Sequence, residues 1–339
     1  MCEDLRLSSY DYALDKGLIA SRPAHPKESA KLLVYERKSA KITHSFFANL
    51  GDFLPPCALI FNDTKVIKAR IYGHKESGAK VELLLHAPLS PQNFLAQIKG
   101  RVRVGEILHF KRGLMAEILE LLEDGLRVVR LVQEGRVLEP GALYALLDEI
   151  GHTPLPPYIK RADEKSDERD YQSIFAKNLG AVAAPTASLH FSEAMVENLS
   201  QKHAIHTLTL HIGAGTFRGV ECENIALHKM HKEFFHIPPQ TRALIDSKSP
   251  LLCVGTTAAR SVEHYARTGL FSGECDLFLH PQNLPLRVDH LLTNFHLPRS
   301  TLIMLVAAFV GRERILALYR EAMRENYRFY SYGDGMLIL

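Results

Sequence analysis

The chain has 339 residues, which is long for one hydrophobic core, so a large domain with a smaller one is the default expectation. Its residues are 46% hydrophobic and 23% charged, a composition typical of globular proteins that argues against a disordered or fibrous chain. The formal net charge of +3 does not by itself indicate a polyanionic partner, although it permits one where basic residues cluster.

The beginning of the chain and its cysteines bear on where the protein works. The first residues, Met-Cys-Glu-Asp-Leu-Arg, lack the basic-then-apolar order of a secretory signal. The 5 cysteines are scattered and include no C-x-x-C pair, which argues for reduced thiols and against a zinc ribbon. We therefore expect a cytoplasmic protein.

The first 70 residues predict a mixed α/β structure. Short apolar runs at 31–35 and 58–61 are typical of buried strands. The second run continues directly into Asn62, Asp63 and Thr64. Because open α/β sheets bind ligands at the carboxyl ends of their strands, these three residues are candidate binding residues.

The pattern changes between residues 72 and 140. Strand-like segments follow one another at the spacing typical of small barrels, at 81–85, 94–98, 106–110, 114–122 and 126–132. Asp124-Gly125 between the last two is a hairpin signal. We predict an α/β catalytic domain formed by residues 1–70 and 151–339, with a small β-barrel domain inserted at 71–150.

The chain returns to the larger domain after residue 150. Residues 153–158 predict a linker, and the charged run 160–170 is either a solvated continuation of it or a loop that faces RNA. The alternation in 204–212 predicts a strand that points His211 away from the core. Further on we expect a strand at 251–254, a turn at 255–257 and helices at 258–267 and 312–326.

The apolar run 302–310 is too short to cross a membrane, which takes roughly 20 residues, so it predicts a buried helix. Ser300 and Thr301 can cap this helix. Asn294 and His296, just before it, would then lie on a turn that is fastened to a rigid core element.

Two glycine-containing segments can approach a ligand closely. Gly213 and Gly215 permit positive φ or close contact, but Arg218 stands where a dinucleotide fingerprint needs glycine, and a plain tight turn is the alternative. Gly255 with the following threonines suits a carboxylate or phosphate at a helix start, although a simple N-cap is equally consistent.

A third segment carries two imidazoles, His228 and His231, with Glu233 close by. This is not the H-E-x-x-H zinc signature, and no cysteine pair completes a ligand set, so a metal is not favoured. An acid/base pair or hydrogen-bonded structural histidines remain as interpretations.

Taken together, these segments closely resemble the family of S-adenosylmethionine:tRNA ribosyltransferase-isomerases of queuosine biosynthesis. The matching motifs are FNDTKVIKAR (61–70), AAPTASLHF (183–191), HIGAGTF (211–217), HKMHKE (228–233), VGTT (254–257), TNFHLPRST (293–301) and YRFYSYGDGMLI (327–338). Among the departures, Ser188 replaces the usual glycine and Gly335 the usual alanine.

The resemblance implies an α/β domain with an inserted β-barrel and an unusual reaction. S-adenosylmethionine is consumed for its ribose, and the acceptor is 7-aminomethyl-7-deazaguanine at the tRNA wobble position. The products are epoxyqueuosine in tRNA, adenine and methionine. The route proposed for the family begins with proton abstraction beside the sulfonium, and no metal or redox cofactor is required.

This chemistry assigns roles to the polar motifs. Histidine titrates in the range that a general base needs, so His190, His211, His231 and His296 are the candidate catalytic residues. Hydroxyls and amides suit the sugar and adenine, and the Gly255 turn with Arg260 suits the methionine carboxylate. The expected substrate-binding residues are Asn62, Asp63, Thr64, Arg70, Pro185, Thr186, Gly213, Gly215, Thr216, Gly255, Thr256, Thr257, Arg260 and Asn294.

The implied partners are S-adenosylmethionine and the anticodon loop of tRNA, with no membrane, and we expect a monomer. Phe191, Phe217 and Phe295 either stack on the splayed base or pack in the core. Phosphate contacts are expected from basic residues at the entrance of the barrel and within it, namely Lys65, Lys68, Arg70, Lys99, Arg101, Arg103, Lys111 and Arg112. An RNA-binding module without activity and a tRNA methyltransferase are the rival interpretations.

Overall fold

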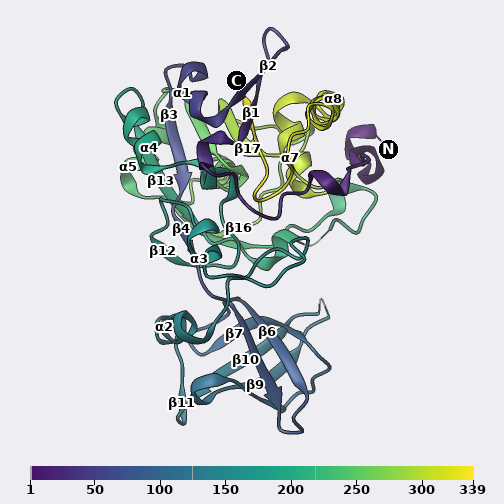
Figure 1. Cartoon of the computed structure of the whole chain (residues 1–339), viewed down its shortest axis with the longest axis vertical. Coiled ribbons are helices and arrows are strands. Elements are labelled where there is room, and N and C mark those ends of the chain that lie inside the picture. The colour runs from purple at the N-terminus through teal and green to yellow at the C-terminus, as the bar shows by residue number, and fades with distance from the viewer. Residues whose placement is uncertain (1, 124, 218) are drawn as a thin grey trace.

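A large mixed sheet organises the upper unit of the molecule (Figure 1). The computed structural model describes residues 2–123, 125–217 and 219–339. In the described residues the sheet has the strand order β16-β14-β13-β3-β15-β17-β18-β1-β2. The strands are β1 (Lys31–Glu36), β2 (Lys41–Phe46), β3 (Ala58–Asn62), β13 (Ile205–Leu210), β14 (Glu233–His236), β15 (Leu251–Val254), β16 (Ser272–Cys275), β17 (His290–Asn294) and β18 (Gly335–Ile338).

The central strands are buried on both faces, which explains their unbroken apolar sequences. Leu59 and Phe61 of β3 pack into a core on one face, whereas Ala58 and Ile60 pack into the core on the other. The helices are α1 (Leu50–Phe53), α4 (Glu193–Ser200), α5 (Pro239–Asp246), α6 (Thr256–Thr268), α7 (Thr301–Val310) and α8 (Arg312–Arg324). Helices α1 and α4 cover the first face, and α5 to α8 cover the second.

Helix α7 is the apolar run of the sequence. The Ser300 hydroxyl accepts a hydrogen bond from the Ile303 N–H at 3.3 Å and so caps the helix, which ends before Gly311 with φ of 86°. No helix in the described part of the chain has the length and apolar character needed to cross a membrane.

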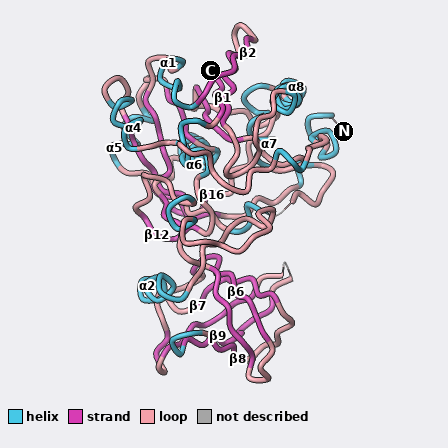
Figure 2. Tube along the Cα trace, in the orientation of Figure 1, coloured by secondary structure: helices cyan, strands magenta, loops and turns pink. Residues whose placement is uncertain are grey.

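The lower unit is a closed β-barrel with one helix at its side (Figure 2). Its sheet has the order β11-β10-β7-β6-β5-β8-β9, and the additional pairing of β10 with β9 closes it. The elements are β5 (Arg70–Lys75), β6 (Lys80–Pro88), β7 (Asn93–Lys99), β8 (Ile107–His109), β9 (Leu114–Leu121), β10 (Arg127–Gln133), β11 (Arg136–Val137) and α2 (Pro140–Ile150). Alternate residues of these strands fill the barrel core.

The predicted fold class, an α/β unit with an inserted barrel, is confirmed. The inserted unit runs from β5 to α2, residues 70–150, and whether it folds by itself as a domain stays a prediction. The hairpin predicted at Asp124-Gly125 involves Asp124, which lies outside the described residues.

The charged run 160–170 is exposed over much of its length, as a solvated linker would be, but two of its carboxylates are buried. Asp167 and Asp170, in the short helix α3 (Asp167–Asp170), are buried. The Asp167 carboxylate accepts hydrogen bonds from Arg161 at 2.6 and 2.7 Å and from the Tyr332 hydroxyl at 3.1 Å. After it, β12 (Asn178–Ala181) pairs with β4 (Thr64–Val66), so the returning chain is packed against the larger unit. Neither of the two interpretations had anticipated this packing.

The turn predicted at 255–257 is also wrong in part. Helix α6 begins at Thr256, and Gly255 alone forms the cap, with φ of 93°. Backbone N–H groups at 256 and 257 therefore belong to the first helical turn and point outward from its end.

Gly335 of β18 offers a test of how tightly this fold is packed. A Cβ at this position would lie 2.3 Å from Phe47 Cε2, so Gly335→Ala forces the Phe47 ring to move. We expect the free energy of unfolding to fall by about 1–3 kcal/mol, as overpacked cores do, measured by urea denaturation.

Gly141→Ala in α2 is the matched control, because a Cβ there meets nothing within 4 Å and alanine favours a helix. Equal stability of the two variants would contradict the close packing of Phe47 against β18.

Candidate functional site

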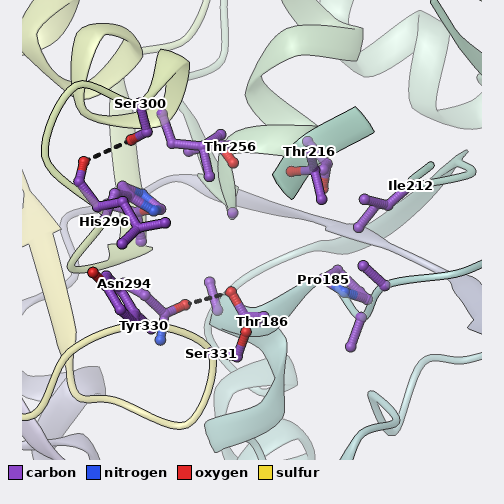
Figure 3. A pocket seen from close by; sticks show the side chains of 18 of the residues that line it. Pro185, Thr186, Ile212, Thr216, Thr256, Asn294, His296, Ser300, Tyr330 and Ser331 are labelled. Carbon is purple, nitrogen blue, oxygen red and sulfur yellow. Dashed lines mark hydrogen bonds between the residues drawn. The ribbon is translucent and has the colours of Figure 1, made fainter. Parts of the chain in front are cut away.

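Several strands end at one edge of the upper sheet, and a cleft opens there (Figure 3). The carboxyl ends of β13, β15 and β17 lead into the cleft. These strands run in the same direction, because β13 and β15 both pair parallel with β3, and β17 pairs parallel with β15. The residues that line it are Tyr158, Tyr171, Ala183, Ala184, Pro185, Thr186, Ala187, Ile212, Thr216, Glu233, Gly255, Thr256, Thr257, Arg260, Thr293, Asn294, Phe295, His296, Leu297, Ser300, Leu302, Tyr330 and Ser331.

The amino end of α6 forms one wall of the cleft. Asn62, buried at the end of β3, holds this wall in place, since its Nδ2 donates to Thr257 Oγ1 at 3.1 Å and to the Leu210 carbonyl at 2.9 Å. Its Oδ1 accepts from the Leu210 N–H at 3.0 Å and from the Thr64 N–H at 3.1 Å. All hydrogen-bonding sites of the Asn62 amide are thus used by protein groups. Asn62 therefore positions the amino end of α6 from outside the cleft.

Asn294 is fixed in a similar way at the end of β17. The Thr186 hydroxyl donates to its Oδ1 at 2.9 Å, as the dashed line in Figure 3 marks, and its Nδ2 lies 3.2 Å from His190 Nε2. The His190 ring stacks on Phe47 with ring centres 4.3 Å apart. Burial, with the charges of Arg328 and Lys27 nearby, lowers the pKa of His190 to about 3, so the ring is a neutral support for Asn294.

His296 stands in the loop between β17 and α7 and lines the cleft. The Tyr319 hydroxyl accepts from its backbone N–H at 2.9 Å, and the Tyr12 hydroxyl donates to its carbonyl. Its Nε2 lies 2.8 Å from Thr293 Oγ1, and no hydrogen bond to its Nδ1 is formed within the described residues. Burial lowers the pKa of His296 to about 3, so the imidazole is neutral at ordinary pH.

A buried ion pair lies deeper along the same wall. The Arg260 guanidinium donates to Glu233, to the Leu277 carbonyl at 3.1 Å and to the Cys275 carbonyl at 3.4 Å. The other Glu233 oxygen accepts from the Gly213 N–H at 3.0 Å.

His231 Nε2 lies 3.2 Å from Glu233 Oε1, the oxygen that Gly213 contacts, but the two groups are not aligned for a hydrogen bond. Burial by itself raises the pKa of Glu233, yet the Arg260 charge beside it, with His231 and the Gly213 N–H, holds that pKa below its usual range.

His211 is held outside the cleft. Its Nδ1 lies 2.8 Å from Thr64 Oγ1, its ring stacks on Phe234 with centres 5.9 Å apart, and burial lowers its pKa. The Asp63 carboxylate accepts hydrogen bonds from Thr209 Oγ1 at 2.6 Å and from Asn178 Nδ2 at 3.0 Å, so its hydrogen bonds are also made within the protein interior.

The opposite wall of the cleft was missed by the sequence reasoning. Tyr158 and Ser331 are joined through their hydroxyls, and the Ser331 N–H donates to the Tyr158 hydroxyl at 3.2 Å. The rings of Tyr158 and Tyr330 are 4.6 Å apart, and Tyr330 has φ of 72°, a conformation that a bulky residue rarely adopts. Burial raises the pKa of Tyr158 to about 12, so it is a neutral donor. The tail motif 327–338 was the signal for this wall, but no chemistry had been assigned to it.

The predicted site residues thus divide into two groups. Those that line the cleft are Pro185, Thr186, Thr216, Gly255, Thr256, Thr257, Arg260, Asn294 and His296. Those that lie behind or outside it are Asn62, Asp63, Thr64, Arg70, His190, His211, Gly213, Gly215 and His231. Of the candidate stacking rings, Phe191 and Phe295 are fully buried and pack in the cores, and the Phe217 side chain lies outside what the structure describes.

Comparison with known proteins gives consistent names. The profile of a family described as "Queuosine biosynthesis protein" matches residues 7–338. A Campylobacter jejuni (strain 81-176) protein named S-adenosylmethionine:tRNA ribosyltransferase-isomerase is 67% identical over 342 residues, covering 100% of both chains. A protein of the same name from Nitratiruptor sp. is 54% identical over 340 residues, again covering 100% of each. The crystal structure of S-adenosylmethionine tRNA ribosyltransferase from Thermotoga maritima is 32% identical, with a TM-score of 0.54 over 98% of this chain and 100% of that one.

The buried state of His190 predicts a pH dependence of stability. The pKa of His190 is about 3 in the folded protein, whereas that of an unperturbed histidine is about 6.5. Between these two pH values His190 is protonated in the unfolded chain and neutral in the folded protein, so a lower pH favours unfolding. The contribution of neutral His190 to the free energy of unfolding is fully present above pH 6.5 and is lost as the pH falls toward 3.

Urea unfolding at pH 6.0 and pH 5.0 measures it. In His190→Asn the loss of unfolding free energy between these pH values should be about 1.2 kcal/mol smaller than in the wild type. Identical losses in both proteins would mean that His190 titrates alike in the folded and unfolded states.

Proposed function

The chain belongs to the queuosine-biosynthesis family of S-adenosylmethionine:tRNA ribosyltransferase-isomerases, and we propose that its cleft carries out that reaction in full. The ribosyl group of S-adenosylmethionine is transferred to 7-aminomethyl-7-deazaguanine at the tRNA wobble position and isomerised. The products are epoxyqueuosine in tRNA, adenine and methionine. The observation that carries the proposal is the convergence of a neutral imidazole, a helix amino end and uncharged hydroxyls on one cleft.

The amino end of α6 suits the methionine carboxylate. Its free N–H groups and partial positive charge attract an anion, and the hydroxyls of Thr256 and Thr257 stand beside them. Arg260, which we had expected to assist, directs its guanidinium to Glu233 and to the carbonyls of Leu277 and Cys275. The carboxylate is therefore bound by backbone and hydroxyl groups, with Arg260 shaping the wall.

The Tyr158 and Tyr330 rings suit the sulfonium and the sugar. Aromatic faces attract cations, and both phenols stay protonated because burial raises the pKa of each to about 12. Uncharged hydroxyl donors can bind the sugar oxygens without neutralising the sulfonium, whose positive charge acidifies the neighbouring 5′ carbon.

Among the candidate bases, the geometry supports His296. It lines the cleft, and contacts to Thr293, Tyr319 and Tyr12 hold both its ring and its backbone. Its low pKa keeps it unprotonated and able to accept a proton at pH 7, but also makes it a weak base. The sulfonium must consequently supply most of the acidification. Once the carbanion forms, adenine leaves, the acceptor amine adds, and the epoxide closes as methionine departs.

The remaining parts of the proposal concern partners and setting. We propose a reaction without a metal or redox cofactor and a monomeric protein. We also propose that it works in the cytoplasm, where the 5 cysteines, all free in the structure, would stay reduced. Several basic residues expected to hold tRNA are already paired, since Lys68 lies 3.2 Å from Glu168 and Arg112 lies 3.4 Å from Glu149. Phosphate contacts fall to basic residues without an ion pair in the described structure, such as Lys65 and Lys99.

Product analysis tests the activity. The protein incubated with S-adenosylmethionine and precursor tRNA should release adenine and methionine in equal amounts, measured by liquid chromatography with mass detection. S-adenosylhomocysteine would identify a methyltransferase instead, and binding of tRNA without any product would identify a module without activity.

Replacement of His296 tests its role. His296→Ala should lower adenine release by about 10²–10⁴-fold, the usual contribution of a general base, while S-adenosylmethionine binding measured by calorimetry changes little. His236→Ala, at an exposed histidine at the end of β14, is the control and should keep wild-type turnover. Near-normal turnover of His296→Ala would exclude it as the base.

A further inference from the structure

One outward face of the barrel carries an ordered set of polar side chains from three neighbouring strands. Tyr72 of β5 is paired with Glu82 of β6, which is paired with Lys99 of β7. In the next row, Arg70 is paired with Leu84, and Leu84 with Gln97. Successive side chains of a strand alternate between faces, so these six residues share one face, which we call the barrel face. The residues between them, Ile71, Leu83 and Ile98, belong to the barrel core.

Five residues of the barrel face, all but Tyr72, line a groove that lies toward the larger unit. The groove is lined by Arg70, Glu82, Leu84, His86, Gln97, Lys99, Pro154, Leu155, Pro157 and Val182. Arg70 spans it, because its Nε lies 3.1 Å from Glu82 Oε1 and its Nη2 donates to the Leu155 carbonyl at 3.1 Å. Arg70 thus connects the barrel to the returning chain. Figure 2 shows the barrel below the larger unit.

The groove and the cleft are neighbours that share a thin wall. Pro157 lines the groove, and the next residue, Tyr158, lines the cleft. Likewise Val182 lines the groove and Ala183 lines the cleft. Two separate segments therefore have the groove on one side and the cleft on the other, which places the two cavities close together.

The side chains of the barrel face suit a single-stranded nucleic acid. Tyr72 is 48% exposed, and its ring is held edge-on by His152 at a centre distance of 5.0 Å, which leaves a supported aromatic face. Gln97 and Lys99 are exposed on the same face two strands away, one with amide groups that can read a base edge and the other with a charge for phosphate. Aromatic rings and basic side chains on a barrel sheet are a recurrent platform for unpaired nucleotides.

We propose that the barrel face binds one unpaired nucleotide of the tRNA anticodon loop, next in the chain to the nucleotide that reacts in the cleft. Tyr72 stacks on its base, Gln97 contacts the base edge, and Lys99 contacts its phosphate. Arg70 neutralises Glu82 and keeps the groove open to an anion. This inference rests on the proposed function, which supplies the RNA, and it assigns the part of that RNA that the groove receives.

Tyr72 variants test the stacking contact. With an anticodon stem-loop RNA as the probe, followed by fluorescence anisotropy, Tyr72→Ala should raise the Kd about tenfold, as loss of one stacked base does. Tyr72→Phe keeps the ring and should stay within about twofold of the wild type. Phe46→Ala removes an aromatic side chain that is 51% exposed on β2, at the far end of the molecule from the barrel (Figure 1), and should also have no effect.

Lys99→Ala tests the phosphate contact. It should weaken binding and lower the slope of log Kd against log salt by about one, because one fewer counterion is released. Lys41→Ala on β2 is the matched control for removal of an exposed lysine. S-adenosylmethionine binding, measured by calorimetry, should be unchanged in every variant.

The outcomes separate this inference from the proposed function. Wild-type affinity for the stem-loop in Tyr72→Ala, or equal losses of RNA and S-adenosylmethionine binding, overturns the inference even when the wild type releases adenine. A wild type that binds the stem-loop through Tyr72 but forms no adenine overturns the proposed function alone. Failure of the wild type to bind the stem-loop overturns the inference directly.

Discussion

The buried amide of Asn62 is the constraint on which the cleft depends. It bonds to Leu210 at the end of β13, to Thr64 at the start of β4 and to Thr257 in the first turn of α6. An amide offers two donors and two acceptor sites, and here both of its heavy atoms are used by groups from different segments. The carboxyl edge of the sheet and the amino end of α6 therefore keep one relative position. Asn294 does the same for β17 and the Thr186–His190 turn.

Burial rather than charge pairing sets the electrostatic character of the cleft. His190 and His296 are held neutral because burial lowers their pKa values, and burial moves the pKa values of the Tyr158 and Tyr330 phenols still further from neutrality. The ion pair of Glu233 with Arg260, which reaches the cleft, is internally compensated. A cationic sulfonium consequently meets aromatic and hydroxyl groups, which stabilise it without quenching the charge that activates its neighbouring carbon.

The inserted barrel contributes to the cleft through the chain that leads out of it. Tyr158 and Tyr171 of this returning segment line the cleft, and Tyr332 of the tail holds the segment through Asp167. The segment has the barrel face on one side and the cleft on the other. The returning segment therefore separates the barrel, which we propose to hold RNA, from the cleft, which we propose to perform the chemistry.

Local pattern in the sequence was enough for the architecture. Unbroken apolar runs such as 58–61 and 251–254 predicted strands buried on both faces, and the regular short strands after residue 72 predicted the barrel, because each pattern reflects burial that a strand imposes on its own residues. Glycine and hydroxyl motifs likewise indicated the segments that meet at the cleft. These features depend on neighbours along the chain.

Only the tertiary structure decided which polar side chain faces the cleft and which supports it. His190, His211 and His296 look alike in sequence, yet one braces Asn294, one binds Thr64 outside the cleft and one lines the cavity. The same holds for Arg260, which pairs with Glu233, and for Tyr158 and Ser331, which come together from positions 173 residues apart. A side chain's role here is set by partners that are distant in the chain, and local periodicity carries no information about them.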